Sequence, residues 1–207
     1  MSIYELSTLT VRVGAQTDAH GAMGSYFSSR AGPEPGKLVG CWLSDIGHQN
    51  RVLVLRKFEG AEELRAERER LLRSADPFGC GAVLAGLMFE TLVLFPGFPA
   101  VDAGPHGPVY EFRRYRMKIG GLASTLEAWE GALPGRAELS VPIVALYALN
   151  GPPQFVHVWA YASLGEREMV RREAAARRLW PPSNYPGSLE PDMIAELYRP
   201  AEFSPLQ

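Results

Sequence analysis

The segment FVHVWAYASLGEREMVRREAAARRLW, residues Phe155–Trp180, has the clearest strand and helix pattern of the chain. Its first part is rich in aromatic and β-branched side chains, which favour a β-strand with a half-buried surface. The part after Ser163 contains three consecutive alanines and no proline until after Trp180, which favours a helix. A weaker strand and helix of this kind are predicted in the first half of the chain, over Val52–Phe58 and Ala61–Arg73. The sequence therefore predicts a strand–helix unit that occurs twice.

An internal duplication is indicated by pairs of matching residues at one constant spacing, the spacing from Tyr4 to Tyr110. The other pairs are Glu5 and Glu111, Arg12 and Lys118, Val13 and Ile119, Gly14 and Gly120, and Glu90 and Glu196. One matched pair would be weak evidence, but several at one spacing indicate two copies of a module. We predict modules over residues 1–98 and 107–207, joined by the proline- and glycine-rich segment Pro96–Pro108.

Each module is predicted to have the β-α-β-β-α-β order of a ferredoxin-like unit, in which the first and third strands are central. The first module's expected elements are strands at 3–11, 38–44, 52–58 and 90–95 and helices at 16–31 and 61–73. The second module's are strands at 109–117, 143–148, 155–161 and 194–198 and helices at 122–136 and from 163 to 180. Because Gly21 and Gly24 dilute the helix at 16–31, we expect it to be short or irregular.

The fold class follows from the bare sheet face of each module. Helices cover one face of a ferredoxin-like sheet, and the other face must be buried elsewhere. Two tandem modules can bury these faces against each other, which predicts an α+β fold with antiparallel sheets packed as a dimeric-type barrel within one chain. Pairing between two chains, as a homodimer, is the alternative that the sequence leaves open.

The composition limits the classes of partner. The 207 residues are 46% hydrophobic with a formal net charge of −2, and no long run carries a single sign. This balance predicts neither a nucleic-acid nor a membrane partner. No early apolar stretch is typical of a signal peptide, and the longest mostly apolar run, Gly79–Phe89, is too short to span a bilayer. We therefore expect a cytoplasmic protein in which Cys41 and Cys80 are reduced core residues.

Three segments carry a family resemblance. They are Tyr4-Glu5-Leu6, the stretch HVWAYASLGER at 157–167 and the closing RPAEFSPL at 199–206. Together they resemble the NIPSNAP family, over nearly the whole chain as two repeats. The first repeat is degenerate, because its corresponding strand has no histidine or tryptophan and ends in Phe58. The resemblance implies the dimeric α+β barrel fold, whose superfamily includes cofactor-free monooxygenases, haem-degrading enzymes and isomerases, but kinship of fold implies little chemistry.

The first candidate site is on the strand at 155–161, where His157, Trp159 and Tyr161 alternate and so share one face. If that face lines a cavity, imidazole, indole and phenol could bind a planar ligand by stacking and hydrogen bonding. His157 could also transfer a proton near neutral pH. The alternative interpretation is that all three are core residues, with His157 buried and hydrogen-bonded.

A second set, Glu111, Arg113 and Tyr115, shares a face of the neighbouring central strand. Glu111 could act as a base or as a ligand anchor, or it could form a structural ion pair, because a buried carboxylate needs a partner. The catalytic candidates are therefore His157, Glu111 and Tyr161. The ligand-binding candidates are Trp159, Tyr110, Arg113 and Tyr115.

No metal or cofactor is predicted. The histidines lack metal-ligand spacing, and neither a phosphate-binding glycine fingerprint nor a Gly-x-Ser-x-Gly elbow occurs in the sequence. The leading hypothesis is a protein that holds a small aromatic or anionic organic molecule between sheet and helices. The alternatives are a cofactor-independent monooxygenase or isomerase that uses His157 with Glu111 or Tyr161, and a non-catalytic scaffold.

Overall fold

The computed structural model describes residues 2–29, 35–99, 102–182 and 187–207. These ranges contain eight strands and four α-helices, in the predicted order within each half. The first half contains β1 (Ile3–Val11), α1 (Gln16–Ser28), β2 (Lys37–Ile46), β3 (Arg51–Phe58), α2 (Ala61–Arg73) and β4 (Leu84–Leu94). The second contains β5 (Val109–Met117), α3 (Leu122–Ala137), β6 (Pro142–Ala148), β7 (Gln154–Tyr161), α4 (Leu164–Ala176) and β8 (Leu189–Pro200).

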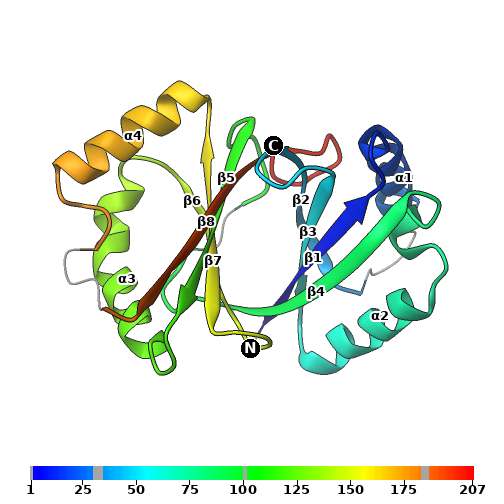
Figure 1. Ribbon diagram of the computed structural model, residues 1–207, viewed down its shortest axis with the longest axis horizontal. Helices are drawn as coiled ribbons and strands as arrows, with labels where there is room; N and C mark the ends of the chain where they lie inside the picture. The colour runs from blue at the N-terminus through cyan, green and yellow to red at the C-terminus, as the bar shows by residue number, and fades with distance from the viewer. Residues whose placement is uncertain (1, 30–34, 100–101, 183–186) are drawn as a thin grey trace.

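The strands form one closed antiparallel barrel in the order β1-β3-β2-β8-β5-β7-β6-β4. In each half the first and third strands are central, as predicted. The halves are joined at two seams, where Ser44 of β2 pairs with Tyr198 of β8 and Val93 of β4 pairs with Tyr147 of β6. The predicted α+β barrel is therefore confirmed, and it closes within a single chain. Helices α3 and α4 lie outside it on one side, and α1 and α2 on the other (Figure 1).

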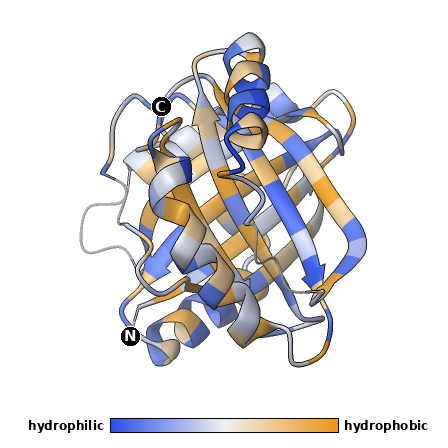
Figure 2. Ribbon diagram, turned by 90° about the vertical axis from the view of Figure 1, so that its left-hand side faces the viewer, coloured by the Kyte–Doolittle hydropathy of each residue, from blue (hydrophilic) through white to orange (hydrophobic). Residues whose placement is uncertain are grey.

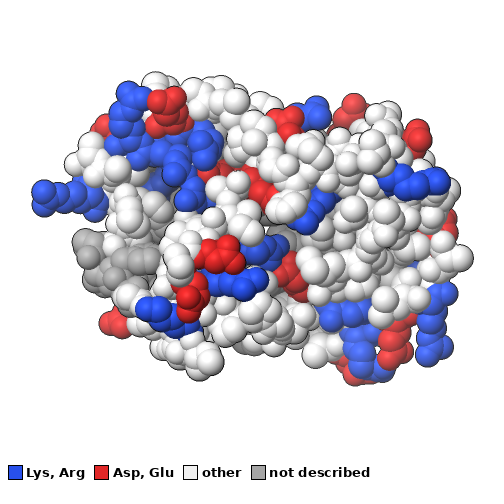
Figure 3. Space-filling view, in the orientation of Figure 1, with Lys and Arg blue, Asp and Glu red and all other residues white. Residues whose placement is uncertain are grey.

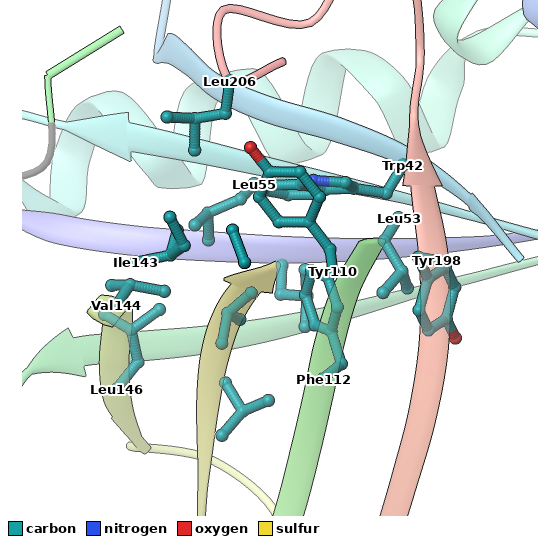
Figure 4. Packing of buried hydrophobic residues seen from close by; sticks show 14 of the residues in the cluster. Trp42, Leu53, Leu55, Tyr110, Phe112, Ile143, Val144, Leu146, Tyr198 and Leu206 are labelled. Atoms are coloured by element: carbon teal, nitrogen blue, oxygen red, sulfur yellow. The ribbon is translucent and has the colours of Figure 1, made fainter. Parts of the chain in front are cut away.

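The barrel interior is packed with apolar side chains from alternate positions of the strands. The ring of Trp42 lies 5.5 Å from that of Tyr110 and 5.0 Å from that of Phe112, centroid to centroid. Leu206, from the segment after β8, is 1% exposed and joins the same cluster (Figure 4). The two sheet faces that the helices leave bare are therefore buried against each other.

The other face of each sheet packs under its own pair of helices. In the first half this layer includes Leu9, Val54 and Met23. In the second half it is mostly aromatic and includes Phe155 and Trp129. Figure 2 shows the second layer from outside, with α3 and α4 in front of the strands. The aromatic layer is the part of the fold in which the candidate site lies.

The first helix differs from the expectation of a short or irregular segment. Helix α1 has 13 residues, as many as α2, with Ala19 and Met23 buried beneath it. Gly21 is tolerated because it points away from this core. A Cβ at Gly21 would meet open space, whereas one at Gly24 would lie 3.3 Å from the ring of Phe203. Gly24 therefore allows the segment after β8 to pack against the helix.

The closing strands and the last helix also differ from their predicted bounds. Strand β4 begins at Leu84 and β8 at Leu189, because each runs the length of a central neighbour, β1 and β5 respectively. Helix α4 ends at Ala176, before the predicted end at 180. Cys41 and Cys80 are free and buried, as predicted.

Candidate functional site

A cavity of about 460 Å³ lies between the outer face of the second-half sheet and its two helices. Its lining comes from β5 (Glu111, Arg113, Tyr115), β7 (Trp159, Tyr161), β8 (Met193), α3 (Arg136), α4 (Arg171, Ala174, Ala175) and the following Trp180 and Pro181. The volume is within the range of sites for small organic molecules. The alternation of side chains along β5 and β7 explains why their residues meet at one cavity, because odd-numbered residues of both strands face the helices.

Glu111 is the centre of the polar contacts at this cavity. Its carboxylate is 1% exposed, and Oε1 accepts hydrogen bonds from Arg113 at 2.8 Å, Arg167 at 2.5 Å and Arg171 at 3.0 Å. Burial by itself would raise the pKa of Glu111, but the hydrogen bond from Arg167 and the three positive charges together lower it. Glu111 is therefore an ionised anchor for arginine side chains.

Arg136, near the end of α3, is the least balanced charge at the site. It is 3% exposed, and its guanidinium carbon lies 4.1 Å from the ring centroid of Trp159. Its hydrogen-bond partners are hydroxyl groups, Ser140 at 2.7 Å and Tyr161 at 3.4 Å. Among the described residues no carboxylate forms an ion pair with it, and burial lowers its pKa. Such a buried cation ordinarily needs an anionic partner.

His157 lies directly behind the cavity wall. It is fully buried, and its Nδ1 accepts a hydrogen bond from Trp159 Nε1 at 2.7 Å. The rings of Tyr115, Trp129 and Phe155 surround it. Burial and the nearby arginine charges lower the pKa of His157 well below its usual value. His157 is therefore a neutral imidazole that supports Trp159 and does not line the cavity.

The structure brings together most, though not all, of the residues predicted from the sequence. Glu111, Arg113, Tyr115, Trp159 and Tyr161 line one cavity. His157 does not join the Glu111–Arg113 pair, because the only hydrogen bond of its ring in the described structure is to Trp159.

Tyr110 lies apart from this group. As an even-numbered residue of β5 it points into the barrel interior, where its hydroxyl donates to the Gln207 carbonyl at 3.3 Å.

Sequence reasoning missed Arg136, Arg171 and Trp180, which all line the cavity. The available signal is the excess of arginine in the sequence of α4, a pattern that is also typical of a solvated helix face.

The first half has a different arrangement at the equivalent place. Glu5 pairs with Arg56 across the β1–β3 ladder, as Glu111 pairs with Trp159 across β5–β7. Arg56 donates to Glu5 at 2.7 Å and to Glu67 of α2 at 2.7 Å, and Arg68 donates to Glu5 at 2.8 Å. The space under α2 is thus occupied by an ion network, with Phe78 packed against Arg56.

Positive charge also surrounds the second-half cavity from outside. Figure 3 shows Lys and Arg side chains gathered over α4. Arg172 and Arg177 pair with acidic residues of the same helix, Glu168 and Glu173. Arg167 and Arg171 instead turn inward to Glu111. The inward-facing part of α4 therefore belongs to the site.

Neither a metal cluster nor a membrane-spanning helix occurs in the part of the chain that the structure describes. It contains no cluster of three or more His, Cys, Asp or Glu side chains suited to a metal ion. None of its helices has the length and apolar character needed to cross a bilayer.

These features define a class of protein: a dimeric-type α+β barrel built from two unequal ferredoxin-like repeats, with a cavity under the helices of the second. The family model of NIPSNAP matches residues 4–77 and 110–205. The chain belongs to the NIPSNAP family.

Relatives with this family name occur in animals. The chain is 26% identical to human Protein NipSnap homolog 2 over 182 residues, which is 84% of this chain and 63% of that protein. It is 24% identical to Protein NipSnap of Drosophila melanogaster, covering 99% of this chain and 79% of that one. The chain thus spans less than two thirds of the human relative.

Among solved structures, a candidate monooxygenase from Lactobacillus acidophilus NCFM superposes with a TM-score of 0.67 at 11% identity. The match covers 97% of this chain and 94% of the other. At this identity the likeness shows the shared barrel fold alone.

Proposed function

We propose that the chain binds a small, partly aromatic organic molecule in the cavity between the second-half sheet and helices α3 and α4. The observation that carries this proposal is the lining of the 460 Å³ space, in which Trp159, Tyr115 and Trp180 surround a few convergent polar groups. An apolar or aromatic wall with a small number of fixed polar groups is typical of small-molecule sites. Tryptophan and tyrosine provide large stacking surfaces for planar rings.

The difference between the two halves supports the proposal. In the first half Arg56 occupies the ladder position equivalent to Trp159, and the network of Arg56 with Glu5 and Glu67 fills the layer. If the layer between sheet and helices served only for packing, it could be filled with side chains in both halves. The second half instead keeps an aromatic wall beside an open volume.

The protonation of the predicted catalytic groups favours binding over acid–base catalysis. Burial, together with the charge of Glu111, raises the pKa of Tyr161 to about 12. The pKa of Glu111 and that of His157 are both lowered, and His157 is sealed from the cavity. A general acid or base works best with a pKa near the operating pH. These three groups are therefore better suited to holding a ligand than to moving its protons.

We place this activity in the cytoplasm. Cys41 and Cys80 are both buried and unpaired, which is typical of proteins from a reducing compartment.

The test is a thermal-shift screen of the purified chain against neutral and charged aromatic compounds. Binding to the folded state raises the melting temperature. We expect hits whose shift is lost in Trp159→Ala and in Ala175→Phe, because Ala175 is exposed at the cavity lining and a larger side chain narrows the space. The matched control is Ala176→Phe, one residue further on the same helix and outside the lining. Shifts that survive both cavity variants would contradict the proposal.

A further inference from the structure

We infer that the ligand of this cavity carries a carboxylate, and that Arg136 binds it while the ligand's aromatic ring lies against Trp159. The inference rests on the proposed function and adds the chemical class of the ligand, an aromatic monocarboxylate.

The charge of the site favours an anionic ligand. Four guanidinium groups, those of Arg113, Arg136, Arg167 and Arg171, surround a single carboxylate, Glu111. Three of the four pair with Glu111. Arg136 is buried, lines the cavity and has hydroxyl partners alone among the described residues. The charge of Glu111 acts on Arg136 from a distance, but a desolvated guanidinium without a directly bonded carboxylate is still unfavourable, and an anion entering the cavity would relieve that cost.

In the first half, the protein itself supplies the anion that the second-half site lacks. Glu67 and Val170 occupy the same place counted from the starts of their helices, Ala61 and Leu164. Glu67 is buried and its carboxylate binds Arg56, which is equivalent to Trp159 in the strand ladder. In the second half the equivalent position is the apolar Val170, so the helix provides no carboxylate there. Val170 packs against the aromatic layer and is outside the cavity lining, so a ligand carboxylate would supply the negative charge that Glu67 supplies in the other repeat.

The geometry between Arg136 and Trp159 suits a ligand that carries both a carboxylate and a ring. The guanidinium lies over the indole face at 4.1 Å, so the cation and the aromatic wall meet at one point of the cavity. A planar guanidinium matches the geometry of a carboxylate with two parallel hydrogen bonds. A ligand that joins a carboxylate directly to a flat ring can contact Arg136 and Trp159 together. Because Arg136 is the one arginine of the site without a carboxylate partner among the described residues, we expect a ligand with one negative charge.

The test compares three probes of the same ring by isothermal titration calorimetry. They are 2-naphthoate, its neutral analogue 2-naphthalenemethanol and the dianionic 2-naphthyl phosphate. We expect 2-naphthoate to bind at least about tenfold more tightly than the alcohol, the factor that one charge-assisted contact supplies, and more tightly than the phosphate. Arg136→Met should remove this preference, and Arg136→Lys should keep part of it. The control is Arg172→Met, which alters an exposed arginine of α4 paired with Glu168 and should leave binding unchanged.

The possible results separate the inference from the function on which it rests. If Trp159→Ala weakens the binding of naphthoate and alcohol while Arg136→Met changes neither, the cavity binds rings and the carboxylate assignment is wrong. Tighter binding of the phosphate than of the carboxylate also overturns the assignment. If folded wild-type protein binds none of the probes, both the inference and the proposed function fail. Circular dichroism and melting temperature establish that each variant is folded.

Discussion

Trp159 Nε1 donates a hydrogen bond to Nδ1 of His157 across 2.7 Å, inside a shell of aromatic rings. An accepting nitrogen carries no proton, so the bond requires the neutral imidazole. Burial, which lowers the pKa of His157, favours the same form. His157 is therefore a positioning residue that fixes the indole at the cavity wall.

The stability of the protein should fall as the pH falls below the ordinary histidine pKa of about 6.5. The unfolded chain takes up a proton on His157 there, whereas the folded chain does not, so acid favours unfolding. His157→Leu should remove this contribution, which reaches about 1.4 kcal/mol per pH unit. Urea denaturation between pH 5 and 7.5 measures the free energy of unfolding of the wild type and of His157→Leu. Parallel pH profiles for the two proteins would show that His157 titrates normally in the fold.

Glu111→Gln should destabilise the chain strongly, because it leaves the guanidinium groups of Arg113, Arg167 and Arg171 without their shared counter-ion. Breaking a buried ion pair costs about 3–5 kcal/mol, and the partial exposure of these arginines places the expected loss near the lower end. The comparison is Glu168→Gln, whose exposed pair with Arg172 should contribute less than about 1 kcal/mol. Equal losses in the two variants, measured by urea denaturation, would contradict the anchor role.

The contribution of Glu111 to stability should also depend on pH, unlike that of a surface carboxylate whose pKa does not change on folding. Its pKa is lowered in the fold, so the stabilisation is complete above the unfolded value of about 4.3 and is lost as the pH falls toward the lower folded value. The difference in unfolding free energy between wild type and Glu111→Gln should therefore shrink below about pH 4. A difference that stays constant down to pH 3 would show that Glu111 is not ionised in the fold.

Val170→Glu should give the second half a carboxylate at the helix position where the first half has Glu67. The new carboxylate would occupy the place of Glu67 and supply Arg136 with an internal counter-ion. We expect the preference for 2-naphthoate over 2-naphthalenemethanol to fall by about tenfold. The control is Val170→Gln, which has the same shape without the charge and should retain the preference. Equal effects of both variants on the calorimetric affinities would point to a steric cause.

Leu206→Ala tests the packed barrel interior. Leu206 is 1% exposed and lies in the cluster that includes Tyr110 and Trp42, so its truncation should cost about 2–5 kcal/mol. Leu72→Ala, at a position that is 66% exposed, should change the unfolding free energy by less than about 0.5 kcal/mol. A small effect at Leu206 in denaturant titrations would indicate a loosely packed interior.

The fold could be predicted because duplication and strand alternation are both visible in the sequence. Strand β5 and helix α2 have the bounds expected from their patterns, and the need to bury two bare sheet faces led to the barrel. The alternation also placed Glu111 with Arg113, and Trp159 with Tyr161, on cavity-facing sides of their strands.

The rest of the site depended on tertiary packing. Arg136 is at the end of a helix whose orientation the sequence does not give, and Trp180 follows the last turn of α4. The arginines of α4 have the same local pattern whether they point outward, like Arg172, or inward, like Arg171. Which of them faced the sheet became evident from the contact with Glu111.

The most direct measurement is a crystal structure of the chain with 2-naphthoate. We predict the naphthalene ring in the cavity between the second-half sheet and α4, against Trp159, with its carboxylate within hydrogen-bond distance of Arg136. A naphthoate bound in the barrel interior or under α2, or one in the cavity with its carboxylate turned away from Arg136, would contradict the assignment.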